Sequence, residues 1–180
     1  YIGIDVPLKP SFEPACIARK PLEETSIARQ VLSTGTGGIN IGQFMRWPSN
    51  TYYCPKPSRE ERDEGCKHLE KKEAHETVKR KEGSKGLNNP RAGAGRMSKE
   101  IYNHHPTVKP VTLFSHLVQI FCPKGGTVLD PFTGSGTTGV ASLLNERSFI
   151  GIERSEEYHT IAQARCEHQI NMNIQMTIPW

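Results

Sequence analysis

Apolar residues recur at helical spacing in the segment 111–122. They lie three and four positions apart, which places them on one face of an α-helix. Pro123, Gly125 and Gly126 follow at the expected end of this helix. The face that we expect to be buried consists of Leu113, Phe114, Leu117, Val118 and Phe121.

Short apolar runs and helical patterns alternate after this helix. They predict strands at 127–130 and 148–153, and helices at 137–145 and 156–168. Strands separated by helices in short succession are typical of a parallel sheet with crossover helices. We therefore expect an α/β fold for the second half of the chain.

The first half of the chain has weaker patterns. The apolar run 14–18 lies between charged residues and predicts a short buried strand. The segment 24–32 is predicted to form a helix, with Ile27, Val31 and Ala28 facing inward.

A charged segment begins after the glycine-rich stretch 35–42, which is not expected to be helical. Residues 51–58 are predicted to form a strand that runs into a loop. Ser58 is followed three positions later by Glu61, which is the spacing of a capping box. This spacing predicts a charged helix over 59–72.

Residues 73–101 contain few apolar side chains. They are mostly Lys, Glu, Gly, Asn and Arg, and they cannot bury enough surface to offset the entropy of ordering. The whole chain of 180 residues is 35% hydrophobic with a mean hydropathy of −0.56, which fits a folded part plus a long polar segment. We expect 73–101 to be a mobile loop or insertion.

The positive charge of the chain is concentrated in its middle. Residues 56–99 carry 13 Lys and Arg against 8 Asp and Glu, whereas the remainder carries 10 against 11. Such a segment suits a surface near a nucleic-acid backbone. It equally suits a solvated insert, and the sequence leaves both interpretations open.

Several classes of protein fit this composition poorly. The five cysteines are odd in number and irregularly spaced, which argues against a disulfide framework and favours a reducing cytoplasm. No apolar run approaches membrane-spanning length, and no signal peptide is visible. The chain does not begin with Met and opens in a segment that looks structured, so we expect a fragment or a processed piece.

Four residues could be considered as zinc ligands: Cys54, Cys66, His68 and His75. Their spacing, C-x11-C-x-H-x6-H, matches no common zinc finger, because ligand cysteines usually come as C-x2–4-C. We therefore assign no metal site.

The stretch VLDPFTGSGTTG, residues 128–139, has the spacing G-x-G-x-x-G at Gly134, Gly136 and Gly139. No lysine follows the last glycine, so a phosphate-binding loop is excluded. A predicted strand precedes the glycines and a predicted helix follows them, as in a nucleotide-binding turn. Glu153 lies 19 residues after Gly134, where a carboxylate accepts hydrogen bonds from the ribose of an adenosine-containing cofactor.

Asp130 helps to distinguish among such cofactors. It ends the strand just before the glycines, where a carboxylate would repel a pyrophosphate and attract a cation. S-adenosylmethionine carries a sulfonium and an ammonium group and no phosphate, and its carboxylate would face the positive end of the helix that begins at Thr137. We expect this cofactor; the alternative is that the glycines merely permit a tight turn.

Three motifs occur in order: HPTVKP (105–110), VLDPFTGSGTTGVAS (128–142) and FIGIERSEEYHTIAQAR (149–165). Together they resemble the N4-cytosine/N6-adenine DNA methyltransferases, in the permuted class whose cofactor half follows the catalytic half. KPSFEPACIARKP (9–21) is similar to a segment of bacterial and prophage members. The resemblance covers the first 22 residues and roughly 101–170. It implies part of a Rossmann-like fold of S-adenosylmethionine-dependent methyltransferases, with a basic flexible insertion.

The resemblance assigns residues to the cofactor. Glu153 would hold the ribose, and Asp130 would line the methionine part. Lys109 could pair with the cofactor carboxylate or face solvent, and His105 could contact the cofactor or only pack at the helix entry. The implied cofactor-binding set is Asp130, Phe132, Thr133, Gly134, Gly136, Glu153, His105, Thr107 and Lys109.

The base-holding motif of this family, Asp/Asn/Ser-Pro-Pro-aromatic, does not occur in the sequence. By the resemblance, it holds a flipped base whose amine attacks the cofactor methyl group, and the enzyme contributes orientation and electrostatics. None of the thirteen prolines is adjacent to another, and in the permuted order the motif would precede Tyr1. We therefore assign no catalytic residue, and we expect the chain alone to bind cofactor weakly or not at all and to transfer no methyl group.

The resemblance, taken with the composition, implies the cofactor-binding part of a cytoplasmic enzyme that methylates adenine or cytosine amines in double-stranded DNA, without membrane association. A missing N-terminal half or a partner chain would complete it. The alternatives are a non-catalytic prophage remnant, a subunit completed by another chain, or a methyltransferase acting on RNA or a small molecule.

Three regions are expected: 1–34 as the end of the catalytic-half sheet, 35–100 as a variable, target-recognition-like and partly disordered insertion, and 101–180 as the cofactor-binding part. The insertion mixes residue types that stack on bases and pair with phosphates. An exposed basic linker would contain the same types. They are Arg46, Trp47, Tyr52, Tyr53, Arg59 and Arg62.

Overall fold

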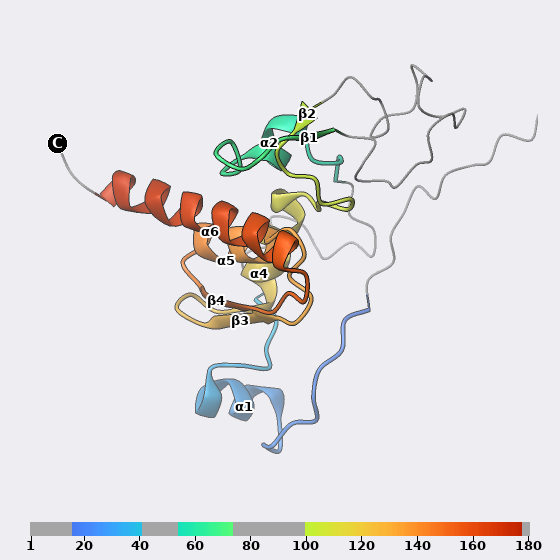
Figure 1. Cartoon of the computed structure of the whole chain (residues 1–180). Coiled ribbons are helices and arrows are strands. Elements are labelled where there is room, and N and C mark those ends of the chain that lie inside the picture. The colour runs from blue at the N-terminus through green and yellow to red at the C-terminus, as the bar shows by residue number, and fades with distance from the viewer. Residues whose placement is uncertain (1–15, 41–53, 74–99, 178–180) are drawn as a thin grey trace, which may run out of the picture. The chain divides into compact units, whose positions relative to one another are not determined.

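The computed structural model describes residues 16–40, 54–73 and 100–177. The chain divides into two units, Tyr1–Gly38 and Ile39–Trp180, which are considered separately below. Figure 1 shows the helices and strands with the labels used here.

The first unit contains the short helix α1, Ile27–Thr34. Ser26 caps its start by accepting a hydrogen bond from the Arg29 amide, and Gly35 ends it in the left-handed conformation. The inward face differs from the prediction. Ile27 and Val31 are 45% and 38% exposed, whereas Gln30 is buried.

Gln30 is buried because its side chain satisfies local backbone groups. Its Oε1 accepts hydrogen bonds from the amides of Glu23 and Glu24, and its Nε2 donates to Thr34. The buried strand predicted at 14–18 is wrong over 16–18, which are irregular and exposed. Residues 14 and 15 lie outside the described residues, as do 51–53 of the strand and loop predicted at 51–58, whose residues 54–58 are irregular.

The second unit is built around two parallel strands, β3 (Thr127–Asp130) and β4 (Ser148–Gly151). Helix α5, Thr137–Leu144, connects them, as a crossover requires. Helices α4 (Val111–Phe121) and α6 (Glu156–Thr177) pack against α5. Figure 1 shows the three helices gathered on one side of the sheet.

This arrangement confirms a mixed α/β fold with a parallel sheet and a crossover helix. The pattern placed β3 correctly at both ends, and α5 and β4 begin where predicted. Helix α6 runs nine residues beyond its predicted end at 168. A larger Rossmann-like sheet stays a prediction, because the described part of this sheet consists of β3 and β4.

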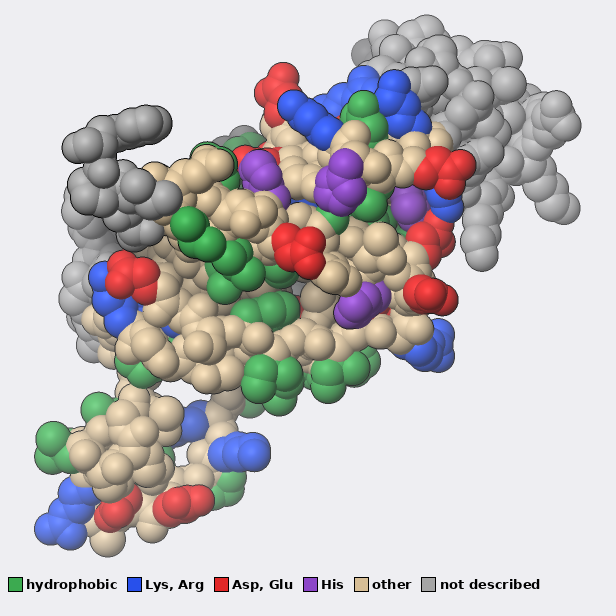
Figure 2. Space-filling view, turned by 60° about the vertical axis from the view of Figure 1, so that its left-hand side comes forward, with side chains coloured by type: hydrophobic (Ala, Val, Ile, Leu, Met, Phe, Trp, Pro, Cys, Tyr) green, Lys and Arg blue, Asp and Glu red, His purple; other side chains and the backbone are tan. Residues whose placement is uncertain are grey.

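The two faces of the sheet differ in coverage. Phe149 faces α5 so closely that a Cβ on Gly139 would lie 2.7 Å from its ring. The opposite face carries Leu129 and Ile150, which are direct partners in the strand register and are 61% and 55% exposed. Ile152, just beyond β4, is 56% exposed. Exposed hydrophobic side chains are also visible in Figure 2.

The predicted inward face of helix α4 is confirmed at Val118, which is buried, and wrong at Phe121, which is 40% exposed. Ile120, which was not predicted, is also buried. The prediction missed Ile120 because a helical wheel does not show that α4 meets α5 along one side and the 39–40 segment along another, where the Asn40 amide donates to the Ile120 carbonyl.

Helix α2 spans only Arg59–Asp63, so the helix predicted over 59–72 is wrong beyond residue 63. Its capping residue is as predicted, since Ser58 Oγ accepts from the Glu61 amide (3.1 Å). The chain turns at Gly65, which has a positive φ of 78°. Residues 72–73 (β1, Lys72–Glu73) then pair antiparallel with β2, Glu100–Ile101, so both ends of the predicted loop 73–101 are strand.

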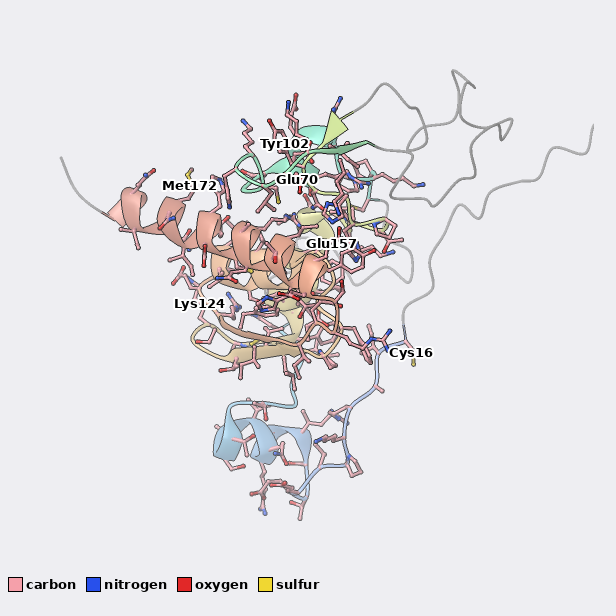
Figure 3. The ribbon with its side chains drawn as sticks, in the orientation of Figure 1. Cys16, Glu70, Tyr102, Lys124, Glu157 and Met172 are labelled. Carbon is pink, nitrogen blue, oxygen red and sulfur yellow. The ribbon has the colours of Figure 1, made fainter. Side chains whose placement is uncertain are left out.

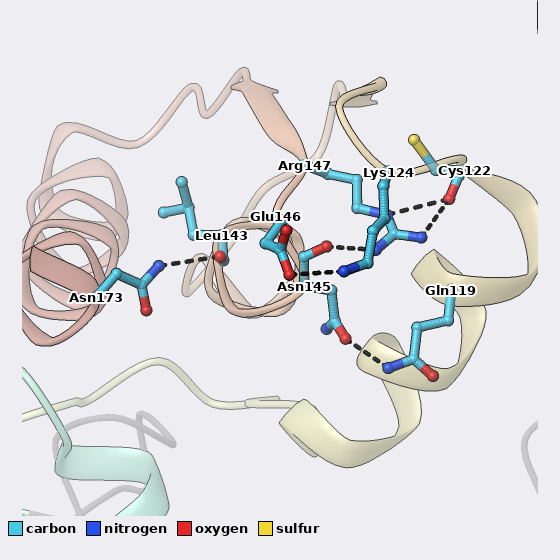
Figure 4. A network of polar contacts seen from close by, with 8 residues as sticks. All are labelled: Gln119, Cys122, Lys124, Leu143, Asn145, Glu146, Arg147 and Asn173. Carbon is cyan, nitrogen blue, oxygen red and sulfur yellow. Dashed lines mark hydrogen bonds and ion pairs between the residues drawn. The ribbon is translucent and has the colours of Figure 1, made fainter. Parts of the chain in front are cut away.

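A buried arginine fixes the corner between α5 and β4 (Figure 4). Arg147 is 6% exposed, and its Nε and Nη2 donate to the Cys122 carbonyl at 3.1 and 2.7 Å. Its Nη1 donates to the Asn145 carbonyl. The end of α4 is thereby joined to the start of β4.

Replacing Arg147 with alanine is expected to destabilise the second unit by about 2 kcal/mol, because the part-buried carbonyls of Cys122 and Asn145 lose their donors. Urea unfolding followed by circular dichroism measures this change. Lys124→Ala is the control, since Lys124 bonds an exposed Glu146 at the same corner (Figure 4) and should have no measurable effect. Equal losses in both variants would contradict the assignment.

No helix in the described ranges is long and apolar enough to cross a membrane.

Candidate cofactor site

The glycine turn connects the carboxyl end of β3 to the start of α5. Gly134 and Gly136 both have positive φ values, 55° and 78°, which side chains rarely permit. Two hydrogen bonds close the turn: the Gly136 amide donates to the Thr133 carbonyl, and the Thr133 amide donates to the Ile152 carbonyl, both at 3.0 Å. The glycines are therefore required by the backbone.

Asp130 holds the turn through both carboxylate oxygens. Oδ1 accepts from the Phe132 amide (2.9 Å), and Oδ2 accepts from the Thr138 hydroxyl (2.6 Å). The carboxylate thus lies at the first turn of α5, with lone pairs remaining for a cationic ligand. Thr133 is buried and donates its hydroxyl to the Asp130 carbonyl, which is a structural role.

Glu153 lies opposite, just beyond β4. Its Oε2 accepts from the Gly134 amide and its Oε1 from the Ser155 amide, each at 2.8 Å. The hydrogen bond from the Ser155 amide, helped by that from Gly134, holds the pKa of this carboxyl below its ordinary value. Glu153 is therefore a charged acceptor at the edge of the turn.

His105 contacts the turn from the side of α4. A Cβ on Gly134 would lie 3.0 Å from His105 Nε2, so the ring packs directly against the backbone. The ring of Tyr158 also packs against His105 in an edge-on arrangement, with 4.5 Å between the two ring centroids. Burial lowers the pKa of His105, and the Glu153 carboxylate partly opposes this effect.

Lys109 and Thr107 lie in the same segment as His105. The Lys109 carbonyl accepts from the Thr137 hydroxyl (3.3 Å), so this part of the chain passes the start of α5. Thr107 is exposed, and its amide donates to His105 Nδ1 (3.3 Å). The structure thus brings the whole predicted set to one end of the β3–β4 sheet.

The residues fit the predicted cofactor in their charge and in the apolar surface beside them. Two carboxylates lie at the carboxyl ends of adjacent parallel strands, where ligands bind in open α/β sheets. The N-cap of α5 is Gly136, which brings no side chain to the amides of the first turn. Phe132 is 88% exposed beside the turn and offers an apolar surface. Carboxylates with an apolar surface suit a cationic nucleoside better than a phosphate.

Two residues at this site were missed by the sequence analysis. Arg165 of α6 is 3% exposed and donates from Nη1 to the Ser135 carbonyl (2.8 Å) and the Thr137 hydroxyl (3.1 Å), so it supports the turn from beneath. Tyr158 packs on His105. Both residues lie in the helix that was predicted after the last strand. Nothing in the local sequence shows which face of that helix contacts the turn.

A second contact group joins α6 to the β1–β2 pair. Glu157 Oε1 forms an ion pair with Lys72 and lies 2.8 Å from His104 Nε2. Figure 3 shows Glu157 at the start of α6 on the side of Tyr102 and Glu70. The segment bordering 74–99 is thereby attached beside the turn.

The zinc alternative finds no support among the described side chains, which form no group of three or more candidate metal ligands. Cys66 is fully buried, and burial raises the pKa of its thiol to about 11, which opposes the thiolate that zinc requires. His75 lies outside the described residues, as do Arg46, Trp47, Tyr52 and Tyr53 of the suggested DNA-contacting set.

Comparison with known proteins gives a family for this sequence. A family model for DNA methylases, of the N6/N4 methyltransferase type, matches residues 9–164, which is most of the chain. Type II methyltransferase M2.MboI of Moraxella bovis is 44% identical over 61 residues, covering 34% of this chain and 22% of that protein. DNA adenine methyltransferase YhdJ of Escherichia coli K12 is 46% identical over 57 residues, covering 32% and 19%.

A solved structure of an M1.HpyAVI–SAM complex is 47% identical, over 34% of this chain and 30% of that chain, with a TM-score of 0.32. The chain spans between about a fifth and about a quarter of the length of the curated relatives that it matches.

Proposed function

The chain belongs to the DNA methylase family, and we propose that it is the cofactor-binding part of an enzyme that methylates an exocyclic amine of adenine or cytosine in double-stranded DNA. The observation that carries this proposal is the pair of carboxylates, Asp130 and Glu153, on either side of the Gly134–Gly136 turn. The named relatives are DNA adenine or type II methyltransferases, which supports DNA as the substrate. An enzyme acting on DNA in bacteria would work in the cytoplasm.

The proposed cofactor is S-adenosylmethionine, which supplies an electrophilic methyl group when bound. Asp130 would face its cationic end, and Glu153 would accept hydrogen bonds from the ribose hydroxyls through its remaining lone pairs. Phe132 would shield the site from water on its exposed side. Thr107 and Lys109 border the start of α5, where the cofactor carboxylate would meet the amides of the first turn.

We further propose that a second polypeptide segment packs on the exposed face of this sheet. The supporting observation is the aliphatic face formed by Leu129, Ile150 and Ile152, each more than half exposed on a two-stranded sheet. This segment would carry the Pro-Pro-aromatic motif that holds the flipped base, since these 180 residues contain no adjacent prolines. If this segment belongs to another polypeptide, the present chain would be a non-catalytic subunit that works only together with it.

The test is methyl transfer to DNA, followed by sequencing that detects modified bases. We expect the chain alone to transfer no methyl groups, and the chain joined to a segment with the base-holding motif to methylate one sequence. The modified base would then distinguish adenine from cytosine. Methylation by the chain alone would disprove the division of labour proposed here. Methylation of RNA in preference to DNA would disprove the substrate.

A further inference from the structure

The short helix α2 is hydrogen-bonded to the segment that contains His105. Arg62 Nη2 donates to the His105 carbonyl (3.0 Å), and the Asn103 amide donates to Asp63 Oδ1 (2.9 Å). Asn103 Nδ2 in turn donates to the Arg62 carbonyl (2.7 Å). These bonds join residues at least 40 positions apart in sequence, so they are tertiary contacts.

These hydrogen bonds matter for stability because Asn103, which takes part in two of them, is buried. Asn103 is fully buried, and its Oδ1 accepts from the His105 amide (3.1 Å), so amide and carbonyl of His105 are both held. Burial lowers the pKa of Arg62, while the charge of Asp63 opposes this effect. Removing one member of such a buried polar network is costly, because its partners are left buried without a hydrogen bond.

Glu61 extends the same connection to helix α4. The capping residue of α4 is Pro110, which has no side chain able to accept from the first-turn amides. Glu61 Oε1 accepts from the Val111 amide instead, at 2.7 Å, across 50 residues. A carboxylate at this end is also favoured by the helix dipole.

The residues that follow α2 are packed against α6. A Cβ on Gly65 would lie 3.0 Å from both the Ala164 carbonyl oxygen and the Arg165 Cα. Cys66 is fully buried. Because Arg165 supports the glycine turn, the segment Glu61–Cys66 contacts the two elements that hold the turn, α6 on one side and the His105 segment on the other.

We propose that the segment 61–66 positions the cofactor site, with Arg62 and Asp63 as positioning residues that hold the His105 ring against Gly134. This inference rests on the proposed function of the turn. Neither side chain is assigned to contact cofactor. Each acts through the His105 backbone, directly or through Asn103.

The experiment compares Arg62→Met with Lys67→Met, an exposed cation next to the same segment, and with Arg62→Lys. First, the imidazole of His105 is titrated by NMR in the cofactor-free chain. Arg62→Met is expected to raise the His105 pKa, since a nearby cation is removed, and to shift the Gly134 amide resonance. Lys67→Met should leave both unchanged, and Arg62→Lys should restore them in part.

Second, S-adenosylmethionine is titrated calorimetrically into the completed protein. Arg62→Met is expected to weaken its affinity by about tenfold, with Arg62→Lys between it and wild type. A folded Arg62→Met protein with unchanged His105 signals and unchanged affinity would overturn the inference. Should Arg62→Met fail to fold, Arg62→Lys decides alone. If Arg62→Met changes the His105 signals but the wild-type protein binds no S-adenosylmethionine, the proposed function is refuted and the positioning contact stands.

Discussion

Replacing Gly136 with alanine is expected to destabilise the second unit by about 2–5 kcal/mol, from backbone strain and overpacking together. Gly136 has φ of 78°, a conformation that costs an L-residue energy wherever it occurs. The added Cβ would also lie 2.8 Å from the Ala162 Cα and 3.0 Å from its carbonyl oxygen. These are backbone atoms of α6, which cannot rotate away as a side chain can.

Gly125→Ala is the matched control for this prediction. Gly125 has φ of 74°, but a Cβ there meets no atom within 4 Å, so only the backbone strain of about 1–2 kcal/mol remains. Both variants are compared by urea unfolding followed by circular dichroism. If the two proteins lost equal stability, the close approach of α6 to the turn would be wrong.

The strands and helices of the second half of the chain were predicted well because their signals are local. Glycines with a required left-handed conformation, such as Gly134 and Gly136, fix where a strand ends and a helix begins. The run Thr127–Asp130 is short, has Val128 and Leu129 at its centre and is bounded by turn residues, and its bounds were confirmed. Asp130 and Glu153 were assigned from their places at the ends of successive predicted strands, their spacing to the glycines and the family resemblance, and the structure brings both to the Gly134–Gly136 turn.

Contacts between distant segments could not be predicted in the same way. Glu61 matched a capping box, yet its carboxylate caps α4 at Val111, and nothing near it in sequence marks that partner. The charged pattern after it suggested a long helix, but Gly65 turns the chain so that it can approach α6. The buried face of α1 was predicted wrongly for a related reason. The polar side chain of Gln30 is buried because it accepts hydrogen bonds from two backbone amides.

The region 35–100 was predicted as one insertion because the prediction rested on its composition. Composition separates polar from apolar stretches, and α2 is strongly charged. Its hydrogen bonds to Asn103, His105 and Val111 nevertheless attach it to the cofactor-binding part. We propose that the variable, DNA-facing portion begins only after β1.

Replacing Glu153 with glutamine is expected to weaken S-adenosylmethionine binding by about 100-fold, because charge-assisted hydrogen bonds are lost. The carboxylate accepts from the Gly134 and Ser155 amides through separate oxygens. A glutamine side chain has one oxygen and one NH2 group, so one of the two amides would face a donor. The turn would open at that amide, and the proposed acceptor for the ribose would be lost with it.

Calorimetric titration of the completed protein with S-adenosylmethionine measures this effect. Glu156→Gln is the control, because Glu156 is an exposed carboxylate three residues further on, in the first turn of α6. Since the pKa of Glu153 is held below its ordinary value, the wild-type carboxylate stays charged across the neutral range, and wild-type affinity should be constant there. Equal weakening by Glu156→Gln would show that general negative charge near α6 matters, rather than the carboxylate at the turn. Unchanged affinity in Glu153→Gln would remove Glu153 from the cofactor site.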